Sequence, residues 1–200
     1  MPLENLHMTV LEVNHSLTEP EIEELVTTLE SKVSEITDFT LDHHARLVKP
    51  MLGYDGAATA LGFLPAAGES TYGNRSGRED RYTYHHLRRD VYNLSASTGV
   101  KIASRYTVPS SHLTIGRFIT KNDFAATEHG RENSSPAKMA KWIRTIEDTN
   151  RWLQDEYWPN VHGMTNEDGQ WIIGQEKGLD CRMGTLWYGG GKSVRLGQGF

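Results

Sequence analysis

Two histidines in this chain are each followed, two residues later, by a threonine between apolar neighbours. The two motifs are His7-Met8-Thr9-Val10 and His112-Leu113-Thr114-Ile115. Chance gives such a pattern roughly 0.1 times in a chain of this composition, so two copies are informative. An imidazole takes up or releases a proton near neutral pH, and a threonine hydroxyl can donate a hydrogen bond. Together the motifs predict acid–base chemistry at a centre that carries oxygen atoms.

This set of side chains fits in-line attack at a phosphorus atom. A neutral histidine takes a proton from the attacking water, and a protonated histidine gives one to the leaving oxygen. The hydroxyls of Thr9 and Thr114 donate hydrogen bonds to the non-bridging oxygens, where charge accumulates in the transition state. The reaction needs neither a metal ion nor a cofactor, so we expect none. The alternative is that both histidines are strand residues whose rings have backbone partners and no chemical role.

Each motif must lie on a β-strand if its histidine and threonine are to act together. Residues i and i+2 of a strand point to the same side, so these two side chains share a face while their apolar neighbours face the core. Alternating apolar residues predict strands at residues 6–13 and 111–118. If the two strands are adjacent, both imidazoles and both hydroxyls converge on one cavity.

Helices and strands interleave along the rest of the chain. Apolar residues at helical spacing, preceded by capping residues, predict helices that begin near Thr18, Asp80 and Ser135. Alternation predicts the remaining strands at residues 45–49 and 57–64 around a turn at 53–56, and in a final hairpin of 170–175 with 179–188. Residues 65–78 are expected to form a loop. The order predicts one α+β domain over residues 1–200, with antiparallel or mixed sheets.

Composition limits the class of protein. The 200 residues are 37% hydrophobic, which is enough for a core, and the net charge of −5 argues against a protein that coats nucleic acid. A short RNA end could still bind in a local basic pocket. The sequence has no apolar run near the ~20 residues of a membrane span, and its N-terminus has no signal-peptide pattern. We therefore expect a cytoplasmic protein, with the nucleus as the alternative.

Longer stretches around the motifs resemble the two-histidine (2H) phosphoesterase superfamily, in particular its fungal RNA ligase/cyclic nucleotide phosphodiesterase-like branch. The stretches are LHMTVLEVNHSLTEPEI, ARLVKPMLGYD, RYTYHHLRRDVYNL, SRYTVPSSHLTIGRF and LDCRMGTLWYGGG. The resemblance covers most of the chain. It implies a bilobed fold in which each lobe places one H-x-T strand at a central cleft, with helices outside. It also implies metal-independent opening of 2′,3′-cyclic phosphates or related 2′-5′ linkages, with catalytic roles for His7, Thr9, His112 and Thr114.

The same resemblance implies a strand and a helix before the first motif, whereas six residues precede His7. We therefore expect either a shortened chain or a first lobe that lacks one strand. Two other functions remain open. One is a module that binds a nucleotide or RNA end without turnover, and the other is an RNA repair enzyme that joins ends through a 2′-5′ bond.

Four further side chains are candidates for substrate binding: Tyr106, Arg117, Trp187 and Tyr188. The aromatic rings could stack on a nucleobase, although aromatic residues on strands more often belong to the core. Strict alternation puts Arg117 on the face opposite His112, and Gly116 on the same face as His112. A bulge near Gly116 would bring Arg117 to the phosphate. Otherwise Arg117 is a solvated surface residue.

Three other patterns are given no functional role. Residues 189–193 suggest a phosphate-binding loop, but Leu186 stands where the first glycine is required, so we expect a flexible tail. The adjacent pairs His43-His44 and His85-His86 do not form a metal site by themselves, because neighbouring side chains diverge on a strand or a helix. The single cysteine, Cys181, is expected to be a small strand residue rather than a catalytic thiol.

Overall fold

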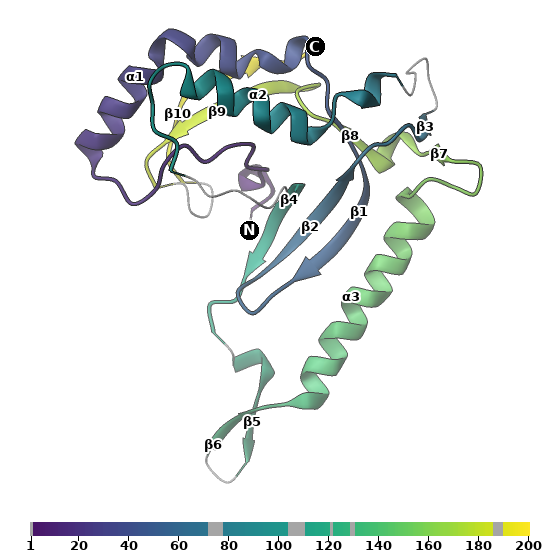
Figure 1. The fold of residues 1–200 in the computed structure, drawn as a ribbon. Coiled ribbons are helices and arrows are strands. Elements are labelled where there is room, and N and C mark those ends of the chain that lie inside the picture. The colour runs from purple at the N-terminus through teal and green to yellow at the C-terminus, as the bar shows by residue number, and fades with distance from the viewer. Residues whose placement is uncertain (1, 72–77, 104–110, 121, 129–130, 186–189) are drawn as a thin grey trace.

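The computed structural model describes residues 2–71, 78–103, 111–120, 122–128, 131–185 and 190–200. These residues form an α+β protein with a curled antiparallel sheet and a second, two-stranded sheet (Figure 1). This confirms the predicted fold class at the level of α+β with antiparallel sheets. Within the described residues, no helix is both long enough and apolar enough to cross a bilayer.

The curled sheet carries the second motif. Its strand order is β4-β2-β1-β8, and every neighbouring pair is antiparallel. The strands are β1 (Arg46–Tyr54), β2 (Ala58–Pro65), β4 (Ser111–Arg117) and β8 (Gln170–Ile172). The predicted turn at residues 53–56 is displaced toward Ala57, because the Asp55 carboxylate accepts hydrogen bonds from the amides of Ala57 (2.7 Å) and Ala58 (2.8 Å). This Asx-type turn sets the register of β1 and β2.

Helix α3 (Pro136–Tyr157) lies along β1 and covers the part of its edge beyond the residues that pair with β8 (Figure 1). The side-chain amide of Asn150 accepts from the Leu52 amide at 2.7 Å and donates to the Leu52 carbonyl at 3.0 Å. The indole of Trp158 donates to the Pro50 carbonyl at 2.9 Å. These contacts satisfy backbone groups that a bare edge would leave available to another chain. As predicted, Ser135 caps the helix and Pro136 is its first residue.

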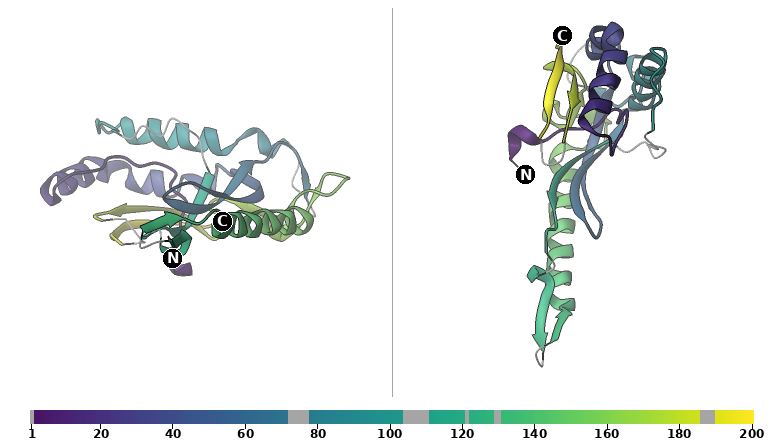
Figure 2. Two further views of the ribbon diagram at one scale, coloured as in Figure 1. Left: turned by 90° about the horizontal axis from the view of Figure 1, so that it is seen from below. Right: turned by 90° about the vertical axis from the view of Figure 1, so that its left-hand side faces the viewer.

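The second sheet pairs β9 (Lys177–Met183) with β10 (Lys192–Gln198), and two helices lie on one side of it. Helix α1 (Glu19–Thr37) contacts both strands, and α2 (Tyr84–Ala96) lies beyond α1 (Figure 2). The predicted capping box of α1 is present: the Thr18 amide donates to the Glu21 carboxylate at 2.7 Å. Helix α2 begins later than predicted, because Thr83 caps it together with His86.

Two sequence predictions at the C-terminus are wrong. The predicted hairpin of residues 170–175 with 179–188 does not form, because β8 pairs with β1 whereas β9 pairs with β10. The residues from Lys192 onward are not a tail but strand β10. Both Nη atoms of Arg195 contact the Asp38 carboxylate, at 3.0 and 2.7 Å, and the Gln198 amide donates to it at 2.9 Å. A partner more than 150 residues away therefore fixes the strand.

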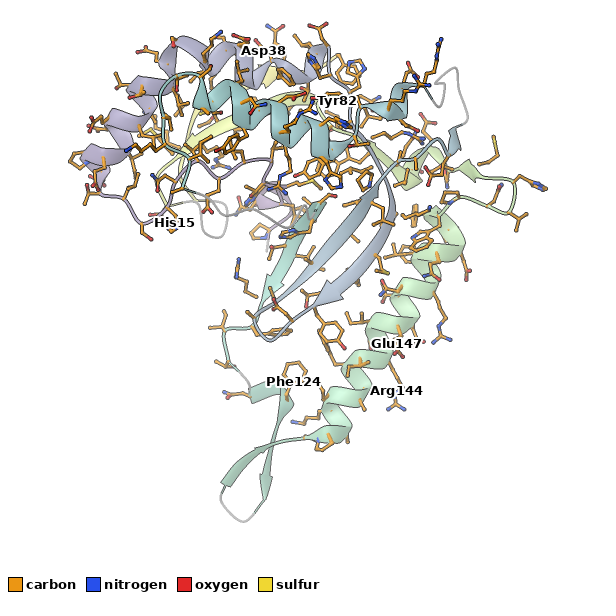
Figure 3. All side chains as sticks on the ribbon, in the orientation of Figure 1. His15, Asp38, Tyr82, Phe124, Arg144 and Glu147 are labelled. Carbon is orange, nitrogen blue, oxygen red and sulfur yellow. The ribbon has the colours of Figure 1, made fainter. Side chains whose placement is uncertain are left out.

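Short elements complete the fold. They are the parallel pair β3 (Ser70–Thr71) with β7 (Met164–Thr165), the hairpin β5 (Ala125–Glu128) with β6 (Arg131–Ser134), and the 3-10 turns η1 (Leu3–Asn5), η2 (Phe39–Leu41), η3 (Glu79–Arg81), η4 (Asn122–Phe124) and η5 (Glu167–Gly169). Strand β3 falls in the predicted loop. Phe124 lies beside α3 (Figure 3) and contacts the rings of Trp142 and Phe118 edge-on, with centroids 5.8 and 5.6 Å away.

The buried core joins β1 to α2. Its members are Ala45, Leu47, Tyr84, Leu87, Val91 and Ile173, with Met8 and Val10 packed against them. A buried ion pair adjoins it: the Arg46 guanidinium contacts the Asp80 carboxylate through Nε (3.0 Å) and Nη2 (2.5 Å). Both side chains are almost fully buried, at 1% and 2% exposure. The sequence analysis did not predict this pair.

We expect the Arg195–Asp38 contact to make stability depend on pH. Hydrogen bonds, first from Arg195 and then from the Gln198 amide, hold the pKa of Asp38 below its usual value. A carboxyl whose pKa is lowered by folding stabilises the fold above its unfolded pKa, and that contribution is lost as the pH falls through the folded pKa. In urea titrations, Asp38→Asn should therefore be less stable than the parent at pH 6, and the difference should shrink below about pH 4. A constant difference between pH 6 and pH 3 would contradict this explanation.

Candidate active site

A single antiparallel bridge joins the two motifs, between Met8 and Leu113. Neighbours on either side of such a bridge lie opposite one another in reverse order. Continued in this register by one residue to either side, the two segments would pair His7 with Thr114, and Thr9 with His112. Opposite residues of an antiparallel pair have Cβ atoms about 4.5–5.5 Å apart, and diagonal neighbours are about 7–8 Å apart. Strand geometry around the bridge would therefore give all four side chains one face, with the two histidines on a diagonal.

The first motif is not part of a continuous strand. The prediction of a strand over residues 6–13 is wrong in extent, because only Met8 forms a bridge. After the bridge the chain leaves the sheet: the Thr9 carbonyl accepts from the Tyr84 hydroxyl at 3.0 Å, and the Val13 carbonyl accepts from the Ala103 amide at 2.9 Å. Tyr84 is fully buried, so it fixes the backbone of the first motif to α2. Nothing in the local sequence pattern indicates this contact between the helix and the first motif.

The ring of His7 has a defined tautomer. Its Nδ1 lies 2.9 Å from the carbonyl oxygen of Asn5. Because a carbonyl only accepts, this Nδ1 carries the proton, and the lone pair of the neutral ring is on Nε2. The side chain is exposed. His7 can therefore take a proton from water through Nε2 when neutral, or give one from Nε2 when protonated.

The second motif lies on β4, as predicted, and is held by pairing with β2. His112 and Thr114 are half-buried, and their partners on β2 are Gly62 and Ala60. Because both residues are small, no large side chain of β2 stands next to His112 and Thr114 on the face that these two share. A Cβ atom at Gly62 would meet no atom closer than 3.7 Å. The second histidine is thus set in a regular strand, next to space at the sheet surface.

A register shift reverses the expected faces of Gly116 and Arg117. Strand β4 pairs Thr114 with Ala60 but Gly116 with Thr59, so one extra residue is accommodated between these pairs. Arg117 consequently has the same facing as Thr114, whereas Gly116 has the opposite facing. The expectation from strict alternation is wrong at both positions. Arg117 is exposed and near the Asp55 carboxylate; hydrogen bonds from two turn amides, and then the charge of Arg117, lower the pKa of Asp55.

A pocket of about 220 Å³ adjoins the first motif. His7 lines it together with Met8 and Val10, the β8 residue Trp171 and residues of β9 that include Asp180. His112 is not among its lining residues. The pocket therefore belongs to the first motif alone.

The other residues singled out in the sequence lie elsewhere in the fold or outside the described residues. Tyr106, Trp187 and Tyr188 lie outside the described residues. The Nδ1 atom of His43 lies 3.0 Å from the Phe39 carbonyl oxygen, and the His44 ring stacks on Phe200. Burial, and then Asp180, raises the pKa of the Cys181 thiol, which keeps it protonated near neutral pH. In the described part of the chain, no group of three His, Cys, Asp or Glu residues could hold a metal ion.

Comparisons of this chain with protein-family models, with curated proteins and with solved structures found no match. The function of the chain must therefore be inferred from the geometry of the two motifs.

Proposed function

We propose that this chain is a 2H-type phosphoesterase that hydrolyses a 2′,3′-cyclic phosphodiester on a nucleotide or an RNA end without a metal ion. The Met8–Leu113 bridge carries the proposal, because it brings the backbone of the first H-x-T motif directly beside that of the second. Two imidazoles and two threonine hydroxyls at one phosphorus atom would supply the base, the acid and the hydrogen-bond donors of in-line displacement.

In the proposed reaction, one neutral imidazole takes a proton from water as the water oxygen bonds to phosphorus. The other imidazole, protonated, gives its proton to the ribose oxygen as the phosphorus–oxygen bond breaks. Thr9 and Thr114 donate hydrogen bonds to the non-bridging oxygens. The Nδ1 contact of His7 supports this scheme, because a proton held at Nδ1 leaves the lone pair of the neutral ring on Nε2.

The proposal includes the finer features of the fold and of the substrate. The curled sheet and the β9–β10 sheet with α1 and α2 are the two lobes of one domain, and the motif face is the floor of the cleft between them. The substrate is a nucleotide or RNA terminus, and the location is cytoplasmic. Arg117, three residues beyond Thr114 on the same face, lies about 10 Å further along the strand. It would therefore contact a more distant part of the substrate than the reacting phosphate.

One observation favours a second candidate function, binding of a nucleotide end without turnover. A single bridge joins the first motif to the curled sheet, whereas the second motif lies in a paired strand. Catalysis requires reacting groups to be held close to one geometry, whereas binding tolerates looser placement.

One experiment separates the two functions. Purified protein is incubated with each 2′,3′-cyclic nucleotide in the presence of EDTA, and product is followed by chromatography beside equilibrium binding. The phosphoesterase predicts product with multiple turnovers, and the binding module predicts saturation without product. Loss of turnover on addition of EDTA, or neither product nor binding with any of the nucleotides, would contradict the proposal.

The buried hydroxyl of Tyr84 gives a further prediction. Tyr84→Phe removes the hydrogen bond to the Thr9 carbonyl and should lower the free energy of unfolding by about 1 kcal/mol. Because the backbone of the first motif then loses its anchor, kcat should fall about tenfold while KM changes less. Tyr92→Phe, on the exposed side of the same helix, is the matched control and should change neither quantity. A Tyr84→Phe enzyme with parental kcat would show that this anchor does not position Thr9.

A further inference from the structure

A groove of about 510 Å³ lies between the curled sheet and α3. Phe63 and Leu113 form part of its floor. In the β2–β4 pairing these residues alternate with Gly62 and His112, so the groove is on the opposite face of the sheet from the motif side chains. The groove and the motif side chains are therefore on opposite sides of the sheet, although Trp171 also lines the pocket beside His7.

Four aromatic rings line this groove. Trp152 and Tyr157 come from α3 and contact each other edge-on, with centroids 5.3 Å apart. Phe63 and Trp171 come from the sheet and make the same kind of contact at 5.8 Å. Trp152 is 51% exposed, although a large apolar ring is normally more buried. The walls are thus largely apolar and carry four aromatic rings.

The charge that lines the groove is negative. Among the described residues that line it, Asp168 of η5 is the charged one, and the remaining lining groups are apolar or neutral. A carboxylate beside aromatic rings attracts a cation twice, through its own charge and through the quadrupoles of the rings. The same arrangement disfavours an anion.

We propose that this groove binds a small organic cation with a flat apolar body. The rings cover the apolar body, and the Asp168 carboxylate pairs with the positive end at the rim. The ligand class differs from the anionic phosphate of the proposed reaction. The inference depends on groove residues alone, so it stands or falls separately from the proposed function.

Berberine, a flat aromatic quaternary ammonium ion whose fluorescence rises in apolar surroundings, is a suitable probe. We expect saturable binding of one berberine per chain, and weaker binding of the aromatic anion 1-anilinonaphthalene-8-sulfonate. Trp152→Ala should weaken berberine binding about tenfold. Tyr92→Ala, which removes another half-exposed aromatic ring from α2, is the matched control and should leave the affinity unchanged.

The charge is tested by Asp168→Asn, an exposed substitution that does not alter the core. The substitution should weaken the binding of berberine about two- to fivefold, as expected for an exposed ion pair, and strengthen the binding of the anion. His7→Ala should bind berberine as the parent does, because His7 does not line the groove. Equal or tighter binding of the anion by the parent, or unchanged berberine affinity in Trp152→Ala, would overturn the proposal.

Discussion

Replacement of His7 or His112 by alanine is expected to lower kcat for opening of a 2′,3′-cyclic nucleotide by about 10²- to 10⁴-fold. Each substitution removes either the group that accepts the proton of water or the group that protonates the leaving oxygen. The double variant should be little slower than the worse single variant, because residues that act as a unit do not contribute additively. The measurement is kcat and KM with EDTA present, with circular dichroism to establish that each variant folds.

His15 supplies the matched control for this prediction. It is exposed, lies on the segment that follows the first motif, and contacts the neighbouring Ser16 hydroxyl at 3.2 Å (Figure 3). His15→Ala should keep the parental kcat, since neither motif contacts it in the proposed scheme. A double variant of His7 and His112 with parental activity would remove the two-histidine mechanism.

The motif pattern was readable from the sequence because strand alternation is a local property. Residues i and i+2 share a face whatever the rest of the chain does, so the sequence could pair each histidine with its own threonine. Which segments become neighbours depends on long-range contacts, so the adjacency of the two motifs could be stated only as a condition. The Met8–Leu113 bridge meets that condition. Whether the set is catalytic is a question for the variants above.

The faces beyond Thr114 could not be read from alternation. A single extra residue in one strand reverses the facing of all residues that follow it. The shift between the Thr114 and Gly116 pairs therefore exchanges the expected positions of Gly116 and Arg117. A bulge depends on how two strands pair, so the sequence of one strand alone does not predict it.

The C-terminal strands were assigned to the wrong partners for a similar reason. Residues 170–175 and 179–188 are neighbours in sequence, which favours a hairpin. The structure instead closes the curled sheet with β8 and leaves β9 to β10. The Arg195–Asp38 contact, which joins residues far apart in the sequence, helps to fix β10. The local pattern of apolar residues does not predict such a contact.

The buried pair Arg46–Asp80 had a sequence signal that was overlooked. Arg46 stands between Ala45 and Leu47 in a run that otherwise predicts a buried strand. Arginine is almost never fully buried unless it is paired, so its presence there indicates a carboxylate partner elsewhere. The identity of that partner, Asp80, follows only from the fold, which brings η3 against β1.

Arg46→Met is expected to lower the free energy of unfolding by about 3–5 kcal/mol. The substitution removes the arginine partner of a carboxylate that is 2% exposed and that also accepts from the Gly68 amide at 3.1 Å. The arginine also donates to the Gln170 side chain and the Glu69 carbonyl, so two more half-buried acceptors lose a donor. Urea denaturation at pH 7 measures the loss. Asp80→Asn tests the same pair from its other side.

Arg151→Met is the matched control, because Arg151 pairs with Asp148 on the outer face of α3 and both side chains are about 70% exposed. An exposed pair of this kind contributes about 0.3–0.5 kcal/mol, so the control should differ little from the parent. The contrast between the two arginines isolates desolvation, since each variant loses one arginine–carboxylate contact and only the buried one leaves a charge out of water. A loss below about 1 kcal/mol in Arg46→Met would mean that Asp80 becomes hydrated or protonated at little cost, and that the pair does not hold η3 against the sheet.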